Sequence, residues 1–510
     1  MTAAYIVGEF LRANAERLPD HPAVVFPDSR QTYEELAGAS AAWSRRLIGL
    51  GVQPGEHVGL LMTNTPEFIE LVFAICSIGA VAVPFNPRYR ALELQHVIAD
   101  ADVRAVVVGR RPGEDLDLLA RLVEAFPDLP GQQARRLRLG GAPVLRQVVS
   151  LDGPTPGVLG VDELDAASEG PAEDLLVQWS TRVRPEDVAL IMYTSGTTAQ
   201  PKGAVLSHEA LTRTAEALAL ARYALTPADR MWDPLPLFHM SGLLPLLASV
   251  RAGSTFLCMA RVDAGEGLAM MRREQATVAF VAFAQLALDL IAQPDYQPSE
   301  LPQLRIVHTG GVPEVLAKVQ LAFPQAIQVN PYGCTEAGGM CATSELSDSA
   351  QQRATFSGRP YPGLEILVVD AENKAVPTGV AGEILIRGYS LFNGYYNNPD
   401  ATAAVVDAQG WLHTGDLGEL DAQGRIRYIS RIKDMLKVGG ENVACVEIEN
   451  FLCGHPAVGI AAVIGVPDER LAEVPVAFVE LRPGANVTEE ELIAYCRGRI
   501  ASFKVPRQVR

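Results

Sequence analysis

Thr194-Ser195-Gly196-Thr197-Thr198-Ala199-Gln200-Pro201-Lys202-Gly203 joins two apolar runs, 188–192 and 204–206, through a short loop of hydroxyls, glycine and one lysine. The apolar runs predict two strands, and Ser207 is placed to cap a helix after the second strand. Glycine lets successive backbone N–H groups turn toward an anion, the hydroxyls add donors, and Lys202 adds a positive charge. The stretch therefore predicts a phosphate-binding loop between two strands.

This loop differs from the Walker A phosphate loop. The GxxxxGK[ST] pattern requires glycine where the chain has Pro201, serine or threonine where it has Gly203, and a helix immediately afterwards. A polar surface linker is the alternative interpretation. Linkers seldom separate two hydrophobic strands with a Pro-Lys-Gly exit, so phosphate binding is favoured.

Composition limits the class of protein. The 510 residues exceed one ordinary core, so we expect at least two domains, and 48% hydrophobic residues suffice to bury them. A formal net charge of -17 opposes binding to nucleic acid and to anionic membranes. No apolar run has the length of a membrane span, and the start does not read as a signal peptide, so a cytoplasmic location is expected. Seven cysteines without a CxxC pair indicate neither a disulfide framework nor a zinc site.

Apolar strands and helices alternate through the first two thirds of the chain. The run 58–62 predicts a buried strand, and Thr65 with Pro66 signals the start of a helix that ends at Gly79. The strand signal then recurs at 80–83, 254–259, 305–308 and 327–330. This alternation predicts an α/β fold with parallel or mixed sheets and covering helices.

The remainder of the chain has shorter elements. Turn signals between 364 and 429 predict a small antiparallel barrel or sheet. The poorly patterned stretch 128–180 is expected to be a variable surface excursion. Beyond Lys433 the pattern predicts a small α+β unit, with helices near 446–452 and 489–496 and strands near 460–464 and 476–481. We therefore expect a large N-terminal domain, 1–430, a hinge at 431–434, and a small mobile C-terminal domain, 435–510.

Further short blocks follow the loop in a fixed order. They are Pro236-Leu237-Phe238-His239, Gly310-Gly311-Val312-Pro313, Tyr332-Gly333-Cys334-Thr335-Glu336, Gly382-Glu383-Ile384-Leu385-Ile386-Arg387-Gly388, Thr414-Gly415-Asp416, Arg431-Ile432-Lys433-Asp434 and Gly439-Gly440-Glu441-Asn442. Their joint order resembles the adenylate-forming (AMP-binding) superfamily, which includes acyl- and aryl-CoA synthetases, luciferases and peptide-synthetase adenylation domains. The resemblance extends from about Thr32 to Arg507.

The resemblance implies a nucleotide site. The loop would hold phosphates, Thr335 would reach a phosphate, and Glu336 would bind magnesium, although a buried structural carboxylate is the alternative. Asp416 would accept both ribose hydroxyls beside Arg431, unless the two are a turn aspartate and a surface arginine. Adenine would lie between Tyr332 and the Gly311 block. The residues so assigned to the nucleotide are Thr194, Ser195, Gly196, Thr197, Thr198, Lys202, Gly311, Val312, Pro313, Tyr332, Gly333, Cys334, Asp416, Tyr428 and Arg431.

The resemblance also implies roles in catalysis and thioester formation. His239 would line the acyl carboxylate and gate the coenzyme tunnel, although a lone histidine in an apolar stretch is more often a packed core residue. Lys433 occupies the hinge position, where one backbone rotation would exchange the face of the small domain. Gly439 and Gly440 would then let the pantetheine arm of coenzyme A reach the acyl carbonyl. Thr335 and Glu336 complete the residues expected to act in catalysis.

The end of the chain departs from the family. The family continues to a Pro-Arg-x-x-x-Gly-Lys loop whose lysine serves adenylation, whereas this sequence stops at Arg510, and Lys504 belongs to the preceding segment. Loss of that cation would slow adenylation by about a hundredfold or more. The expected function is therefore an acyl-CoA synthetase that forms the thioester from an acyl adenylate and CoA and is defective in ATP-dependent adenylation.

Two alternatives stay open from sequence. The first alternative to the expected function is a fully active ATP-dependent acyl- or aryl-CoA ligase whose last residues are missing from the sequence. The second is a non-catalytic acyl-adenylate binder. Expected ligands are an acyl adenylate or AMP and coenzyme A, with ATP and Mg²⁺ if adenylation is retained. Expected partners are a hydrophobic carboxylate and a separate adenylating enzyme, and a carrier protein could replace CoA. The acyl pocket is expected to draw on Phe238, His239, Phe283, Gly310, Gly338 and Met340, whose glycines leave room beside apolar walls.

Overall fold

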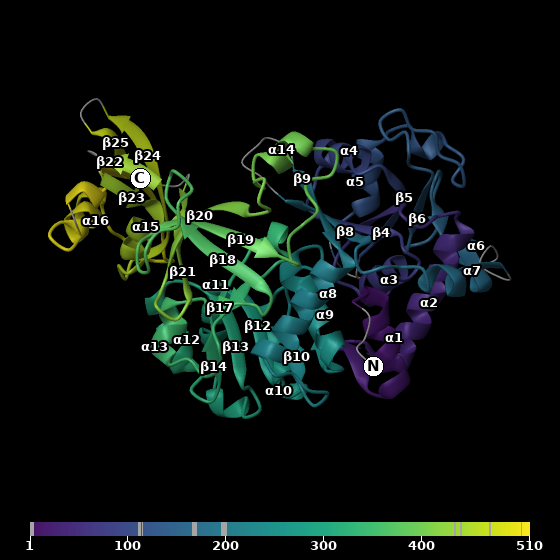
Figure 1. Cartoon of the computed structure of the whole chain (residues 1–510), viewed down its shortest axis with the longest axis horizontal. Coiled ribbons are helices and arrows are strands. Elements are labelled where there is room, and N and C mark those ends of the chain that lie inside the picture. The colour runs from purple at the N-terminus through teal and green to yellow at the C-terminus, as the bar shows by residue number, and fades with distance from the viewer. Residues whose placement is uncertain are drawn as a thin grey trace. The chain divides into compact units, whose positions relative to one another are not determined.

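The computed structural model describes most of the chain. The described residues are 5–110, 114, 116–165, 171–194, 201–432, 435–438, 441–468, 471–500 and 502–510. Two compact units are present: Met1–Glu365 with Ile386–Gly410, and Ile366–Leu385 with Trp411–Arg510 (Figure 1). This division does not coincide with a boundary after residue 430, and the expected domain and hinge limits stay predictions.

The first sheet of unit 1 carries the beginning of the predicted phosphate loop. Its strand order is β7-β6-β5-β3-β4-β8-β9. Strands β3 to β8 pair in parallel, whereas β8 and β9 are antiparallel neighbours. The strands are β3 (His57–Met62), β4 (Val81–Phe85), β5 (Val103–Gly109), β6 (Gln147–Ser150), β7 (Leu159–Gly160), β8 (Val188–Thr194) and β9 (Lys202–Ser207).

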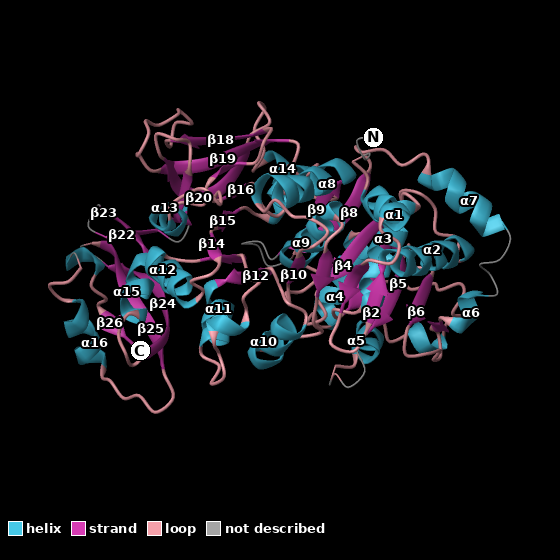
Figure 2. Cartoon of the chain, turned by 90° about the horizontal axis from the view of Figure 1, so that it is seen from below, coloured by secondary structure: helices cyan, strands magenta, loops and turns pink. Residues whose placement is uncertain are grey.

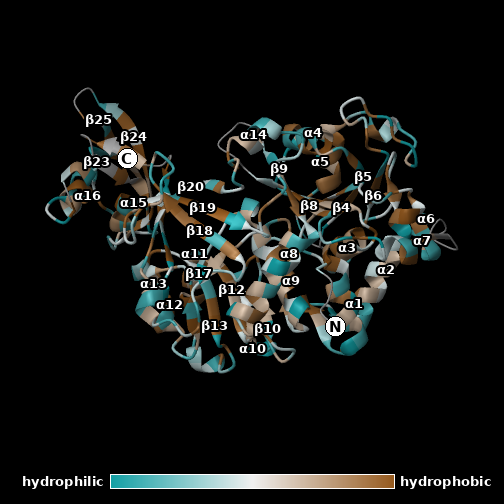
Figure 3. Ribbon diagram, in the orientation of Figure 1, coloured by the Kyte–Doolittle hydropathy of each residue, from teal (hydrophilic) through white to brown (hydrophobic). Residues whose placement is uncertain are grey.

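Helices cover both faces of this sheet. α2 (Tyr33–Gly49) and α3 (Pro66–Ser77) lie on one side of β4 and β5, and α4 (Ala91–Asp100) and α5 (Leu118–Ala125) lie on the other (Figure 2). The predicted start of α3 is confirmed, because the side chain of Thr65 accepts a hydrogen bond from the Phe68 N–H. Nearly all of α3 is buried, and it is brown in Figure 3, as expected for a helix between a sheet and other helices.

The expectation of a surface excursion at 128–180 is wrong in part. This stretch adds strands β6 and β7 to the sheet, and all four residues of β6 are buried. It also contains η1 (Leu129–Gly131), α6 (Asp162–Asp165) and α7 (Pro171–Ser180). A strand of four residues is too short to show a periodicity, and its burial comes from pairing with β5, so the sequence pattern missed it.

The second sheet of unit 1 has the order β14-β13-β12-β10-β11-β1-β2 and is parallel except for β2. Its strands are β1 (Pro22–Val25), β2 (Arg30–Thr32), β10 (Arg230–Trp232), β11 (Thr255–Leu257), β12 (Val278–Phe283), β13 (Ile306–Gly310) and β14 (Ile327–Val329). Around them lie α1 (Val7–Arg17), α8 (His208–Glu216), η2 (Ala217–Arg222), α9 (Met240–Ala252), α10 (Ala264–Arg273), α11 (Ala284–Ile291), η3 (Pro298–Glu300), α12 (Pro313–Ala322) and α13 (Ala350–Thr355). The α/β class predicted from sequence is confirmed.

Small elements complete unit 1. A three-stranded sheet consists of β15 (Pro331–Tyr332), β16 (Ala342–Thr343) and β17 (Arg359–Pro360), and η4 (Thr335–Ala337) lies between its first two strands. The helix α14 (Pro399–Ala403) follows a segment that runs beside β9.

The predicted antiparallel sheet and the small α+β fold occur in the second part of the chain. The sheet order is β18-β19-β20-β21, formed by β18 (Leu364–Val369), β19 (Gly382–Gly388), β20 (Leu412–Leu420) and β21 (Ile426–Arg431). A second sheet contains β22 (Met435–Val438), β23 (Glu441–Ala444), β24 (Val458–Asp468), β25 (Ala472–Leu481) and β26 (Gln508–Val509), with α15 (Cys445–Cys453), α16 (Glu489–Cys496) and η6 (Ser502–Lys504). In the described part of the chain, no helix combines the length and apolarity needed to cross a membrane.

Candidate active site

The two ends of the phosphate loop lie opposite each other. Thr194 ends β8, Lys202 begins β9, and these two residues are register partners in the antiparallel pair. The prediction that the loop lies between two strands is therefore confirmed. The predicted phosphate contacts Ser195, Gly196, Thr197 and Thr198 lie outside the described residues.

The Tyr332 to Glu336 block forms a compact turn at the end of the second sheet. Tyr332 lies in β15 and is only 7% exposed, whereas Thr335 and Glu336 in η4 are half-buried. A Cβ on Gly333 would lie 2.5 Å from the carbonyl oxygen of Gly339, so a larger residue would prevent the turn from closing. The turn thus leaves Thr335 and Glu336 partly exposed.

Tyr395 connects Glu336 to the lysine of the loop. Its hydroxyl donates a hydrogen bond to Glu336 Oε1 at 2.8 Å, and Lys202 Nζ lies 5.3 Å from the centroid of its ring. Residues 393–396 run along β9, because Val205 N–H donates to Gly394 O at 3.0 Å. Sequence reasoning missed Tyr395, since nothing in the local pattern links it to a residue 59 positions earlier.

His239 lies at the start of α9, close to the Glu336 turn. It is exposed, so it is not the packed core residue of the alternative interpretation. A Cβ on Gly339 would lie 3.0 Å from Met240 Cβ, which shows that the turn packs against the first residue of α9. Partial burial of its ring and the positive charge of Arg88 lower the pKa of His239, so the imidazole is neutral at pH 7.

Asn64 fixes the backbone that leads to His239. It is 3% exposed, and its Nδ2 donates to Leu235 O at 2.9 Å and to Met259 O at 3.0 Å. Its Oδ1 accepts from Leu237 N–H at 2.8 Å. Sequence reasoning missed this residue, and the available signal was a polar side chain between a buried strand and the helix cap Thr65. Asn64 therefore orients the segment that presents the histidine.

The Gly311 block and Phe283 occupy the ends of neighbouring strands. Phe283 ends β12, is the register partner of Gly310 in β13, and is 63% exposed. Gly311, Val312 and Pro313 follow immediately, with Pro313 beginning α12. A Cβ on Gly310 would lie 3.7 Å from Pro331 Cδ, so this block borders the strand that carries Tyr332. The carboxyl ends of parallel strands are where ligands bind in open α/β sheets.

Asp416 and Arg431 form a pair within unit 2. They are register partners in the hairpin of β20 and β21, and Arg431 Nε lies 2.9 Å from Asp416 Oδ1. The Asp416 side chain is 4% exposed, whereas that of Arg431 is 45% exposed. Tyr428 of the same strand is 43% exposed. The predicted Lys433, Gly439 and Gly440 lie outside the described residues.

Glu336 fits a magnesium ion that a nucleotide brings with it. Among the described residues, no three His, Cys, Asp or Glu side chains gather into a metal cluster. Magnesium bound with nucleotides needs only one or two protein carboxylates, because phosphates and water complete its octahedron. The hydroxyl of Tyr395 occupies Oε1 of Glu336, which leaves Oε2 to bind a cation.

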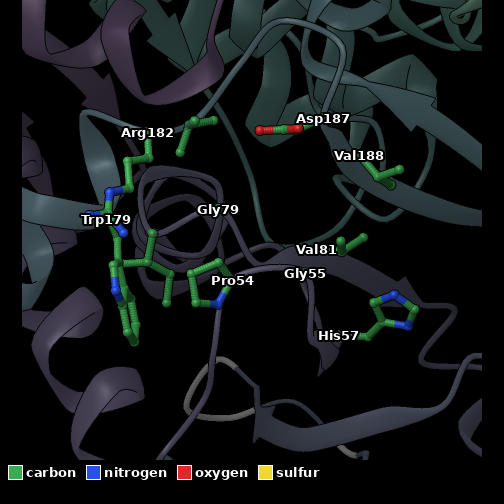
Figure 4. Close-up of a pocket in the computed structure, with 11 residues that line it drawn as sticks. Pro54, Gly55, His57, Gly79, Val81, Trp179, Arg182, Asp187 and Val188 are labelled. Atoms are coloured by element: carbon green, nitrogen blue, oxygen red, sulfur yellow. The ribbon is translucent and has the colours of Figure 1, made fainter.

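A cavity of about 420 Å³ lies at the amino ends of three interior strands of the first sheet (Figure 4). Its walls come from residues that precede or begin β3, β4 and β8, including His57, Gly79 and Asp187, with Trp179 and Arg182 facing them. The phosphate loop follows the other end of β8. The cavity is therefore separate from the residues that the sequence motifs single out.

Known proteins share both the sequence and the structure. A family model described as AMP-binding enzyme matches residues 11–396, and one described as AMP-binding enzyme C-terminal domain matches residues 447–510. A methyl-dioxo-octahydro-indenyl-propanoyl:CoA ligase of Mycobacterium tuberculosis is 36% identical over 501 residues, covering 97% of this chain and 92% of the relative. The mitochondrial medium-chain acyl-CoA ligase of Rattus norvegicus is 31% identical over 521 residues, covering 99% and 83%.

A solved structure extends the comparison. The anthranilate CoA ligase AuaEII in complex with anthranoyl-AMP superposes with a TM-score of 0.83 at 26% identity, covering all of this chain and 94% of the other. The fold, the order of motifs and these matches define an adenylate-forming enzyme. The chain belongs to the AMP-binding enzyme family. Its enzyme class is acyl-CoA ligase. Enzymes of this class use ATP and CoA as reactants and form an acyl adenylate as the intermediate.

Proposed function

We propose that the protein activates a hydrophobic carboxylic acid with ATP and transfers the acyl group to coenzyme A. The observation that carries the proposal is the convergence of Lys202, Tyr395 and Glu336, two of which the motifs assign to phosphate and magnesium. Lys202 begins β9, Glu336 lies in η4, and Tyr395 lies in the segment that runs beside β9. A cation and a carboxylate that contact the same tyrosine suit a magnesium-bound triphosphate better than either charge alone.

The first half-reaction joins the acid to AMP. A carboxylate oxygen of the acid attacks the α-phosphorus of ATP, and the bond to the pyrophosphate oxygen breaks. Lys202 and Thr335 bind the phosphate oxygens as negative charge redistributes. Glu336 would hold the magnesium ion, which supplies charge neutralisation to the phosphates. Asp416 would accept the ribose hydroxyls, and its ion pair with Arg431 orients the carboxylate.

The second half-reaction forms the thioester. The thiol of CoA attacks the carbonyl carbon of the acyl adenylate, the bond to the phosphate oxygen of AMP breaks, and the thiol proton is released. His239 is neutral and exposed beside the Glu336 turn, which suits a residue that borders the carbonyl. The roles of Lys433 as hinge and of Gly439 and Gly440 as the tunnel for pantetheine stay predictions.

The acid is expected to be apolar and bulky. Phe283 exposes a large apolar ring at the end of β12, next to Gly310, so an apolar ligand could cover surface that is otherwise exposed. The relatives named above act on a fused-ring propanoate, on medium-chain acids and on anthranilate. Ring-bearing and medium-chain acids are therefore the first candidate substrates. We also propose that the reaction takes place in the cytoplasm.

The comparisons do not support the expected defect in adenylation or the separate adenylating partner. The matched relatives are named as ligases, and this chain covers 83 to 94% of their length. We therefore favour the ATP-dependent ligase, in which both half-reactions occur. That the protein performs thiolation alone stays a prediction, and the rates of the two separate steps can test it.

The test measures the two half-reactions separately. The protein is incubated with ATP, Mg²⁺ and a panel of acids while pyrophosphate release is recorded, and in parallel with synthetic acyl adenylates and CoA while thioester is recorded. We expect both products for at least one ring-bearing or medium-chain acid. Thioester without pyrophosphate would identify a thiolation enzyme, and neither product with tight adenylate binding would identify a binder.

A further inference from the structure

Tyr395 lies between the two charges on which the proposed function depends. Its hydroxyl donates to Glu336 Oε1 at 2.8 Å, and Lys202 Nζ lies 5.3 Å from its ring centroid. A cation at this distance from an aromatic ring is attracted by the negative face of the ring. One side chain therefore contacts the carboxylate with its polar end and the lysine with its ring.

The backbone holds Tyr395 firmly in this place. Its N–H donates to Thr402 Oγ1 at 2.9 Å, and Tyr395 forms an isolated antiparallel β-bridge with Ala204 of β9. The neighbouring Phe392 N–H donates to the backbone oxygen of Glu336 at 2.9 Å. The segment that carries Tyr395 thus pairs with the lysine strand on one side and with the carboxylate turn on the other.

We propose that Tyr395 is a positioning residue that keeps Lys202 and Glu336 apart and ready for a magnesium-bound triphosphate. In the described part of the chain, Lys202 and Glu336 form no ion pair, although both contact the same tyrosine. Direct pairing would neutralise the cation needed by phosphate and the carboxylate needed by magnesium. The inference rests on the proposed function and adds a residue that prevents this pairing.

The hydroxyl and the ring make separable contributions. The hydroxyl bond fixes the rotation of the Glu336 carboxylate with Oε1 occupied and Oε2 left for the ion. The ring gives Lys202 a partner that carries no net charge, so phosphate does not have to displace a carboxylate from the ammonium. Tyr395→Phe removes the first contribution alone, and Tyr395→Leu removes both.

Tyr396 provides a matched control. Its hydroxyl also donates to a carboxylate, Asp102 Oδ2, at 3.0 Å, but neither Lys202 nor Glu336 is its partner. Tyr396→Phe therefore deletes the same chemical group one position along the chain. Thermal unfolding of each variant, compared with the unaltered protein, shows whether the fold is intact.

The experiment measures ATP binding by calorimetry over a range of Mg²⁺ concentrations, without acid or CoA. Tyr395→Phe is expected to raise the Mg²⁺ concentration for half-maximal binding about tenfold, since it removes one hydrogen bond to a charged group. Tyr396→Phe is expected to change it by less than about twofold. Tyr395→Leu is expected to raise this Mg²⁺ concentration more than Tyr395→Phe does. In a protein that already carries Glu336→Gln, Tyr395→Phe is expected to raise it by less than about a further twofold.

Each outcome decides between the inference and the function beneath it. A folded Tyr395→Phe protein with the Mg²⁺ dependence of Tyr396→Phe would overturn the role of the hydroxyl. A Tyr395→Leu protein equal to Tyr395→Phe would overturn the role of the ring as a spacer. An unaltered protein that binds no magnesium-bound ATP would instead overturn the proposed function, together with this inference.

Discussion

The Lys202, Tyr395 and Glu336 group of unit 1 differs in construction from the Asp416 and Arg431 pair of unit 2. The pair forms within one hairpin, where antiparallel register places its two members opposite each other. The group of unit 1 joins side chains that are 59 residues or more apart in the chain and come from β9, from η4 and from the segment beside β9. Local register thus creates one charged site, whereas long-range packing creates the other. Disturbance of distant backbone should therefore affect the first group and spare the pair.

The largest effect on activity is expected from removing the carboxylate of Glu336 in the unit 1 group. Glu336→Gln should slow adenylation about a hundredfold, because the neutral amide would hold magnesium poorly and the ion would no longer neutralise the phosphates as negative charge redistributes. Thiolation of a supplied acyl adenylate should change by less than about threefold, since no pyrophosphate leaves in that step. Pyrophosphate release and thioester formation check the two expectations. Equal slowing of both steps would contradict the assignment of Glu336.

Loss of a long-range backbone support comes next. Asn64→Ala should lower the free energy of unfolding by about 2 to 3 kcal/mol, because backbone groups of residues 235 and 237 lose buried partners. The exposed amide of Gln285, which donates to Asp289 Oδ1 at 2.7 Å, gives the control, and Gln285→Ala should cost less than about 0.5 kcal/mol. Urea unfolding measures both. A mild effect of Asn64→Ala would show that water or other groups replace the bonds.

The local pair is tested by its nucleotide affinity. Asp416→Ala should weaken AMP binding by about 2 kcal/mol, or roughly thirtyfold, because one carboxylate would serve two ribose hydroxyls. Calorimetric titration with AMP measures the loss. Titration with 2′,3′-dideoxy-AMP supplies the control, since that ligand lacks the hydroxyls and should bind the variant and the unaltered protein equally. Unchanged AMP affinity would remove Asp416 from the site.

Acid should lower the free energy of unfolding through His308. This residue of β13 is fully buried, and burial lowers the pKa of its imidazole to about 3. The unfolded chain therefore binds the proton first, and stability falls by roughly 1.4 kcal/mol per pH unit as pH drops below about 6.5 toward 3. His308→Asn should flatten this slope by about that amount, whatever its effect at neutral pH. Equal slopes for both proteins in urea unfolding from pH 6.5 to 5 would argue against a buried neutral imidazole.

The elements with strong local signals were predictable. Thr65 followed by Pro66 marked the start of α3, and the apolar runs at 188–192 and 204–206 marked β8 and β9, because caps and continuous apolar strands depend on nearby residues alone. β6 escaped prediction, since four residues carry no period and are buried only by pairing with β5. Tyr395 and Asn64 escaped for a related reason. Their partners lie far away in sequence, and no spacing rule joins them.

The sequence by itself determined the class of the protein. Its ordered motifs, the phosphate loop between two apolar strands and the alternation of strands with helices define an α/β adenylate-forming enzyme, because each of these signals is written in adjacent residues. Only the tertiary structure decided which side chains share the site. Lys202 and Glu336 meet through Tyr395 because β9, η4 and the segment 392–396 pack together, and packing of distant segments depends on the whole core rather than on any local pattern.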